Sequence, residues 1–108
     1  MLIKFKTPVE ISDNSGRQYE PKGLVLNSAN VVAVNRITKE RGIDVLGFDI
    51  ITNVSATVAT FVDGKYGLYV MPLTFRLEYE TVARCNLVFD RLKIALVGAP
   101  SESSEIDI

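Results

Sequence analysis

The chain has 108 residues, of which 47% are hydrophobic, and a formal net charge of −1. This length predicts one domain with a modest core, and no apolar run approaches the roughly 20 residues of a membrane-spanning helix. Without histidine and with a single cysteine, Cys85, histidine-based acid–base catalysis is excluded and a structural zinc site is not expected.

Cysteine usage and the first residues both favour a cytoplasmic protein. A lone cysteine forms no internal disulfide, which agrees with a reducing compartment. The sequence begins Met-Leu-Ile-Lys-Phe-Lys, which lacks the long apolar middle and the cleavage site of a secretory signal.

The first third of the chain predicts short strands around a polar loop. Residues 2–7 alternate apolar and basic side chains, the pattern of a half-buried strand. Residues 12–23 are rich in turn formers, and Arg17, Tyr19 and Lys22 lie in this loop. Its tip could reach a nucleic acid strand, or it could be a plain solvated hairpin tip.

The middle of the chain continues the strand pattern. Residues 24–37, 43–51 and 54–62 are rich in valine, isoleucine and threonine, which favour strands. Gly47 interrupts the second of these runs and predicts a bulge or a tight bend.

Asp63 and Gly64 predict a two-residue type I′ turn, because both central residues of that turn have positive φ. Residues 66–79 follow as a strand that carries Tyr69 and Tyr79. Residues 82–97 are interpreted as a second strand folded back on the first.

The predicted strand over residues 82–97 carries two cations that could bind phosphate groups. Arg91 and Lys93 are two residues apart, so on a strand they share a face. Aromatic and basic side chains on neighbouring strands suit single-stranded nucleic acid, although an ordinary hairpin with a solvated outer face fits the same pattern. Cys85 is expected to be a small buried side chain rather than a nucleophile.

The last residues differ in composition from the rest. Residues 101–108 carry three of the 13 acidic side chains, so residues 1–100 hold 12 basic against 10 acidic groups, a net charge of +2. We therefore expect one domain over residues 1–98 and a flexible acidic tail over residues 99–108.

Five to seven short strands without a helix predict an all-β barrel or sandwich. Exposed strand edges then favour a homodimer. The carboxylates are scattered and no Gly-rich phosphate-binding fingerprint is present, so no enzymatic activity, cofactor or metal is expected.

A family resemblance rests on four pieces of the sequence: Gly-Leu-Tyr-Val at 67–70, Thr-Phe-Arg at 74–76, Tyr79, and Phe-Asp-Arg-Leu-Lys-Ile at 89–94. In this order they resemble the C-terminal half of filamentous-phage single-stranded DNA-binding proteins. The resemblance implies a small five-stranded OB-like barrel with protruding β-hairpin loops. It also implies a homodimer that coats single-stranded DNA cooperatively, in viral DNA replication or packaging in the host cytoplasm.

The resemblance also implies roles for individual residues. Arg91 and Lys93 would contact the DNA backbone, and Tyr79 would stack on a base. Arg17, Tyr19 and Lys22 would form a DNA-binding wing, and Tyr69 would add a further stacking surface. Residues 30–62 have no counterpart in the family, and Glu78 and Glu80 flank Tyr79 with like charges that repel phosphate.

Two functions therefore stand side by side. The first is the sequence-independent binding of single-stranded DNA, with RNA as an alternative ligand; the acidic tail would then contact its own DNA groove or a partner protein. The second is a small all-β protein–protein interaction module, such as a phage structural part or an inhibitor of a host protein.

Overall fold

The computed structural model describes residues 1–12, 18–19, 23–98 and 104–108. Strands dominate, and the elements follow one another as β1 (Leu2–Lys4), β2 (Val9–Ile11), β3 (Gln18–Tyr19), β4 (Val25–Asn27), η1 (Ser28–Asn30), β5 (Val31–Glu40), β6 (Ile43–Val62), β7 (Lys65–Glu78), α1 (Val82–Val97) and β8 (Glu105–Asp107).

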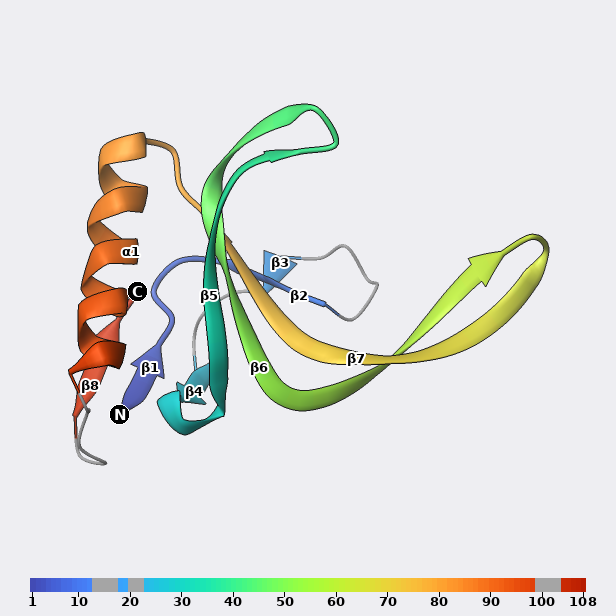
Figure 1. Ribbon diagram of the computed structural model, residues 1–108, viewed down its shortest axis with the longest axis horizontal. Coiled ribbons are helices and arrows are strands. Elements are labelled where there is room, and N and C mark those ends of the chain that lie inside the picture. Colours follow the sequence, from blue (N-terminus) through green and yellow to red (C-terminus); the bar gives the residue numbers. More distant parts are fainter. Residues whose placement is uncertain (13–17, 20–22, 99–103) are drawn as a thin grey trace.

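The main sheet is antiparallel and has five strands in the order β3-β2-β7-β6-β5. It curls into a half-barrel, and the far end of the β6–β7 hairpin projects away from the body (Figure 1). The expected all-β class, a small OB-like curled sheet with a protruding hairpin, is confirmed.

A tight turn closes the β6–β7 hairpin as the sequence indicates. Asp63 and Gly64 have φ values of 53° and 77°, and Val62 pairs with Lys65 across them, so the predicted two-residue turn with positive φ is confirmed. Gly47 lies opposite Glu78, and a Cβ there would collide with the Leu77 carbonyl oxygen. Its missing side chain lets β6 and β7 approach closely at the bend.

The prediction that residues 82–97 form a strand is wrong, because they form α1. Thr81 caps the helix by accepting a hydrogen bond from the Arg84 N–H at 3.1 Å, and Gly98 ends it. Cys85, Val88 and Leu92 are buried on one side, at the three- and four-residue spacing of a helix rather than the two-residue spacing of a strand.

The expectation of a flexible tail is wrong for residues 104–108. β8 pairs in parallel with β1, so that Ile106 lies beside Ile3, and the Ile108 N–H donates to the Lys4 carbonyl at 2.9 Å. Ile106 and Ile108 are 8% and 1% exposed. Glu105 and Asp107, which alternate with the two isoleucines, are exposed, and Glu105 forms an ion pair with Lys4 at 2.9 Å.

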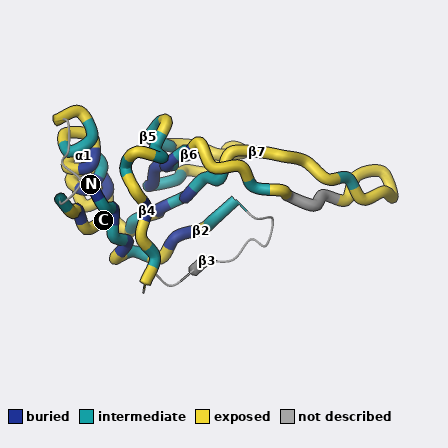
Figure 2. Tube along the Cα trace, turned by 90° about the horizontal axis from the view of Figure 1, so that it is seen from below, coloured by how far each residue is buried: buried dark blue, intermediate teal, exposed yellow. Residues whose placement is uncertain are grey.

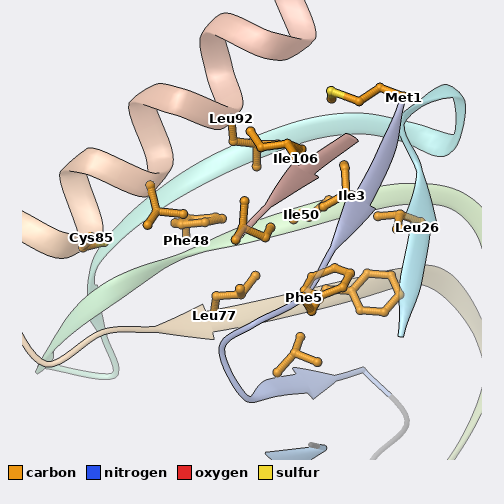
Figure 3. Close-up of a cluster of buried hydrophobic side chains, with 14 residues drawn as sticks. Met1, Ile3, Phe5, Leu26, Phe48, Ile50, Leu77, Cys85, Leu92 and Ile106 are labelled. Carbon is orange, nitrogen blue, oxygen red and sulfur yellow. The ribbon is translucent and has the colours of Figure 1, made fainter. Parts of the chain in front are cut away.

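The core lies between α1, the smaller sheet β4-β1-β8 and the inner face of the main sheet (Figure 3). Its buried members come from every layer: Met1, Ile3, Phe5, Val9, Leu26, Phe48, Ile50, Phe75, Leu77, Cys85, Val88, Leu92, Ile106 and Ile108. Cys85 is fully buried as expected, and burial raises the pKa of its thiol. Arg36 joins three elements here, donating to the Gly47 carbonyl at 2.7 Å and to Asn86 on α1 at 3.4 Å.

Because Ile108 is fully packed, we expect Ile108→Ala to lower the free energy of unfolding by about 2–5 kcal/mol, the usual range for truncating a buried isoleucine. The exposed neighbour Asp107 provides the control, since Asp107→Ala should stay within about 0.5 kcal/mol of the parent. Urea unfolding measures both. Equal stability of the two variants would contradict the packing of this segment.

Candidate functional site: the exposed arm

The projecting part of the β6–β7 hairpin begins at a break in its register. Three residues of β6, 52–54, lie opposite the single residue Leu73 of β7, an irregularity that bends a strand pair and increases its twist. Thr52 is buried there; its hydroxyl donates to the Leu73 carbonyl at 2.7 Å and accepts from the Val54 N–H at 3.2 Å. Beyond this bulge, β6 and β7 pair with no other described strand than each other; we call residues 54–72 the arm.

Ser12 fixes the base of the arm from the neighbouring strand. Its N–H donates to the Thr74 carbonyl at 3.0 Å, and its hydroxyl oxygen accepts from the Thr74 N–H at 2.8 Å. The same hydroxyl lies 3.4 Å from the Pro72 carbonyl oxygen. Since proline has no N–H to donate, the ladder is interrupted where the arm leaves the body.

Most described residues of the arm are exposed, as the yellow parts of the tube in Figure 2 show, and many of them are large and hydrophobic. Eight of the fifteen exposed large hydrophobic residues in the described chain belong to it: Val54, Phe61, Val62, Tyr66, Leu68, Tyr69, Val70 and Met71. An exposed apolar surface that is contiguous marks an interaction site, whereas scattered apolar residues do not.

Four of these side chains form one face of the ribbon. Tyr66, Leu68 and Val70 alternate along β7, and Phe61 pairs with Tyr66 across the hairpin, with ring centroids 4.9 Å apart. The exposed fractions are 81% for Tyr66, 77% for Leu68, 73% for Val70 and 61% for Phe61. We call this surface the Tyr66 face.

The opposite face of the arm is also apolar. Val62, Tyr69 and Met71 lie there, and the Tyr69 ring rests against Gly67, only 3.1 Å from where a Cβ would be. In the described part of the chain no third strand pairs with this ribbon, and the large side chains named on both faces are exposed. Both faces are therefore available to a partner.

Charge is nearly missing from the arm. Asp63 and Lys65 at the tip are its only charged residues, and their formal charges cancel. Nucleic acids are attracted chiefly by cations that neutralise phosphates, so the arm offers stacking surfaces without matching positive potential.

The outer face of the main sheet is dominated by carboxylates. Arg76, at the centre, is held by both carboxylate oxygens of Asp49 and by Glu40 at 2.6 Å. These hydrogen bonds raise the pKa of Arg76 and lower the pKa of Glu40. Glu10 and Glu78 line the same shallow hollow. Four acids therefore surround one guanidinium, which opposes binding of phosphate here.

The helix separates the two cations that a strand would have aligned. Each residue of an α-helix turns the side chain by about 100°, so residues two apart point to nearly opposite sides. Arg91 and Lys93 are both exposed on α1, but they cannot form the shared face that the strand interpretation required. The Lys93 ammonium lies 5.4 Å from the Phe89 ring centroid.

Tyr79 lies against the core, which disagrees with the expected stacking role. Its ring packs on Phe48 with centroids 5.8 Å apart, and burial raises the pKa of its phenol. Thr7 partly offsets that shift, although no described residue makes a hydrogen bond of good geometry with the buried hydroxyl.

The remaining predicted residues lie in different places. Tyr69 is on the arm and exposed. The backbone of Tyr19 belongs to β3 and pairs with Val9, but its side chain is not among the described parts of the structure. Arg17 and Lys22 lie outside the described residues. Thus the described members of the predicted site do not meet at one surface.

The prominent residues that the sequence prediction did not single out are Phe61, Leu68 and Val70. Their signal was present: after the Asp63-Gly64 turn, residues 66–71 are apolar at both parities, which is unusual for a strand with one solvated face. Such a strand is either buried on both sides or covered by a partner.

Comparisons with family models, curated proteins and solved structures found no match for the chain. No helix in the described part is long and apolar enough to cross a membrane. Nor do the described residues contain a cluster of three or more histidine, cysteine, aspartate or glutamate side chains that could hold a metal ion.

The ion pair between Arg76 and Glu40 predicts that the stability of the fold depends on pH. Arg76 lowers the pKa of Glu40 in the folded state, so the pair stabilises the fold above the unfolded-state pKa, and this stabilisation is lost as pH falls through the folded pKa. We expect the Glu40 carboxyl, followed by NMR, to titrate at lower pH in the parent than in Arg76→Gln. Identical titration curves would contradict this ion pair.

Proposed function

We propose that this chain is a small protein–protein interaction module that buries its arm against another protein chain. The observation that carries the proposal is the exposure of large apolar side chains on both faces of a ribbon that its own domain does not cover. A phage structural part and an inhibitor of a host protein are both modules of this kind.

The energetics of a lone ribbon support a partner. An isolated two-stranded hairpin is only marginally stable in water, and most of the arm lacks a third strand or a covering layer. Burying one large apolar side chain contributes about 1.5–3 kcal/mol, so the four side chains of the Tyr66 face could supply roughly 6–12 kcal/mol before the costs of association are subtracted.

The exposed strand edges favour protein over other partners. An edge strand presents unpaired N–H and C=O groups, and another extended peptide satisfies them by adding a strand, with alternate side chains entering apolar pockets. The arm has two such edges and nearly no charge. This combination suits a polypeptide better than a polyanion.

A photo-reactive residue tests the proposal. With p-benzoylphenylalanine in place of Leu68, irradiation in the cells that naturally make the chain should yield a covalent adduct to a protein. The matched control is the same residue at Ile43, which is 69% exposed in the other hairpin but lies off the arm. If the folded Leu68 variant gives no more protein adduct than the Ile43 control, the arm is not a protein-binding surface.

Single-stranded DNA binding is the second candidate, and one feature favours it. Tyr66 and Tyr69 expose their rings beside Lys65 on the arm, and exposed rings next to a cation suit base stacking, which contributes about 1–3 kcal/mol per base. Arg91 and Lys93 would have to supply phosphate contacts from α1. The acidic outer face of the sheet weighs against this function.

An oligo(dT) titration tests the second candidate. The chain has no tryptophan, so its tyrosine fluorescence reports stacking. DNA binding predicts quenching that salt reverses and that Arg91→Ala/Lys93→Ala weakens without changing the circular dichroism. No quenching at low salt rules out DNA binding, and quenching that the double variant leaves intact removes α1 from the site.

A further inference from the structure

The second unusual surface is a groove at the other end of the molecule. It lies between the beginning of β5 and the last turns of α1 and has a volume of about 870 Å³. Its walls include Val31, Val32, Val34, Lys93, Leu96 and Val97. Lys93 is the one charged side chain among its described lining residues, which also include the polar Asn27 and Ser28 and Met1 with its N-terminal amino group. The groove therefore combines apolar walls with polar and cationic groups.

One wall of this groove is an open strand edge. β5 is the last strand of the main sheet, and no described strand pairs with its outer side. The register of β5 shifts between Val31 and Ala33, which leaves Val32 as the extra residue of a bulge, 66% exposed. An occupant must offer both apolar side chains and backbone groups that can pair with an edge.

We propose that the groove holds the arm of a second copy of this chain, with the Tyr66 face against the groove wall and the arm's β7 edge along β5. This inference rests on the proposed function and names the partner. The arm is a β ribbon with free edges, so it supplies the backbone pairing that β5 lacks. The tip carries Asp63 and Lys65 with cancelling charges, so it brings no net positive charge beside Lys93.

The dimensions agree with such a contact. Each strand of the arm continues about eight residues beyond the bulge, which corresponds to about 25 Å at roughly 3.3 Å per residue. Stable interfaces bury about 800 Å² per partner. Two aromatic side chains with about 150–250 Å² each, joined by Leu68, Val70 and the strand edge, approach that order.

The geometry makes the assembly head-to-tail. The arm and α1 lie at opposite ends of the long axis (Figure 1), so the arm does not fill the groove of its own chain. Each copy would donate one arm and accept another. Such a heterologous contact builds a ring where the rotation closes and a filament where it does not, unlike the symmetric homodimer expected from the sequence.

Two double variants separate the halves of the contact. Leu68→Thr/Val70→Thr removes apolar surface from the arm while keeping strand-favouring side chains. Val32→Lys/Val97→Lys places charge in the groove at side chains that are 66% and 83% exposed, where the fold tolerates it. Ile43→Thr is the control, an exposed apolar residue outside both surfaces. Circular dichroism verifies the fold of each.

Light scattering after size-exclusion chromatography gives the masses. The parent and Ile43→Thr should form multiples of 11.9 kDa, and each double variant should weaken assembly by at least about 30-fold, as loss of an interface hot spot does. A mixture of the two double variants should give a 1:1 dimer, since it contains one intact arm and one intact groove.

Other outcomes overturn the inference in distinguishable ways. A groove variant that assembles like the parent shows that arms pack on each other. A parent that stays monomeric at high concentration rejects the second copy but leaves the proposed function intact, and the Leu68 photo-adduct then identifies the other protein. An arm variant that assembles normally rejects the arm as the self-contact.

A cysteine pair tests the contact without weakening it. Cys85 is fully buried, so introduced cysteines are the ones that react. Leu68→Cys/Val32→Cys should form inter-chain disulfides on oxidation and give a ladder of covalent oligomers, whereas Leu68→Cys/Ile43→Cys should not. A ladder of equal strength from both variants overturns the assigned groove.

Discussion

The bulge at residues 52–54 is the constraint on which the rest of the architecture depends. On its body side, β6 and β7 present Phe48, Ile50, Phe75 and Leu77 to one continuous core. On its far side the same two strands leave that core and carry apolar residues into solvent. The Thr52 hydroxyl makes the change of register possible, because it satisfies the Leu73 carbonyl and the Val54 N–H that the ladder leaves unpaired. A strand pair without this irregularity would continue the curl of the half-barrel instead of forming an arm.

The sequence predicted those parts of the fold whose signals are local. Alternation, β-branched composition and a turn that needs positive φ are read within a few residues, and the curled sheet, the Asp63-Gly64 turn and the close approach at Gly47 agree with them. The helix was missed because Leu87, Phe89, Arg91 and Lys93 alternate well enough to resemble a strand. The helical spacing of Cys85, Val88 and Leu92 and the Thr81 cap were equally visible. Residues 82–97 fit both the two-residue repeat of a strand and the three- to four-residue repeat of a helix. In such a case a run of sixteen residues without glycine or proline favours a helix, since strands of that length are uncommon.

The segment 104–108 could not be placed from composition. The alternation of acidic residues and isoleucines at the end of the chain covers only four residues, too few to predict a strand. Acidic, serine-rich ends of chains are usually disordered. What decides their state is a distant strand, β1, which offers an unpaired edge and a space for Ile106 and Ile108. The described residues of the predicted site are dispersed for a related reason. Arg91, Lys93, Tyr69 and Tyr79 were grouped by their order along two supposed strands, but tertiary structure places them on a helix, an arm and a core. Which of these residues lie close together depends on the topology of the fold, and the local sequence patterns did not determine that topology.

Surface character then weighs the two functions against each other. A protein that coats a polyanion gathers cations along a path lined with aromatic rings, but here the rings are on an arm of zero net charge and the broad sheet face carries Glu10, Glu40, Asp49 and Glu78 around one guanidinium. A β ribbon that exposes both faces and both edges raises the free energy of the isolated chain until another surface covers it. The same chain also has a partly apolar groove beside an edge of β5 with which no described strand pairs. The proposed contact between copies would cover the Tyr66 face and the groove together, because one edge of the arm would meet the edge of β5. A single interface is therefore our proposal for both the arm and the groove.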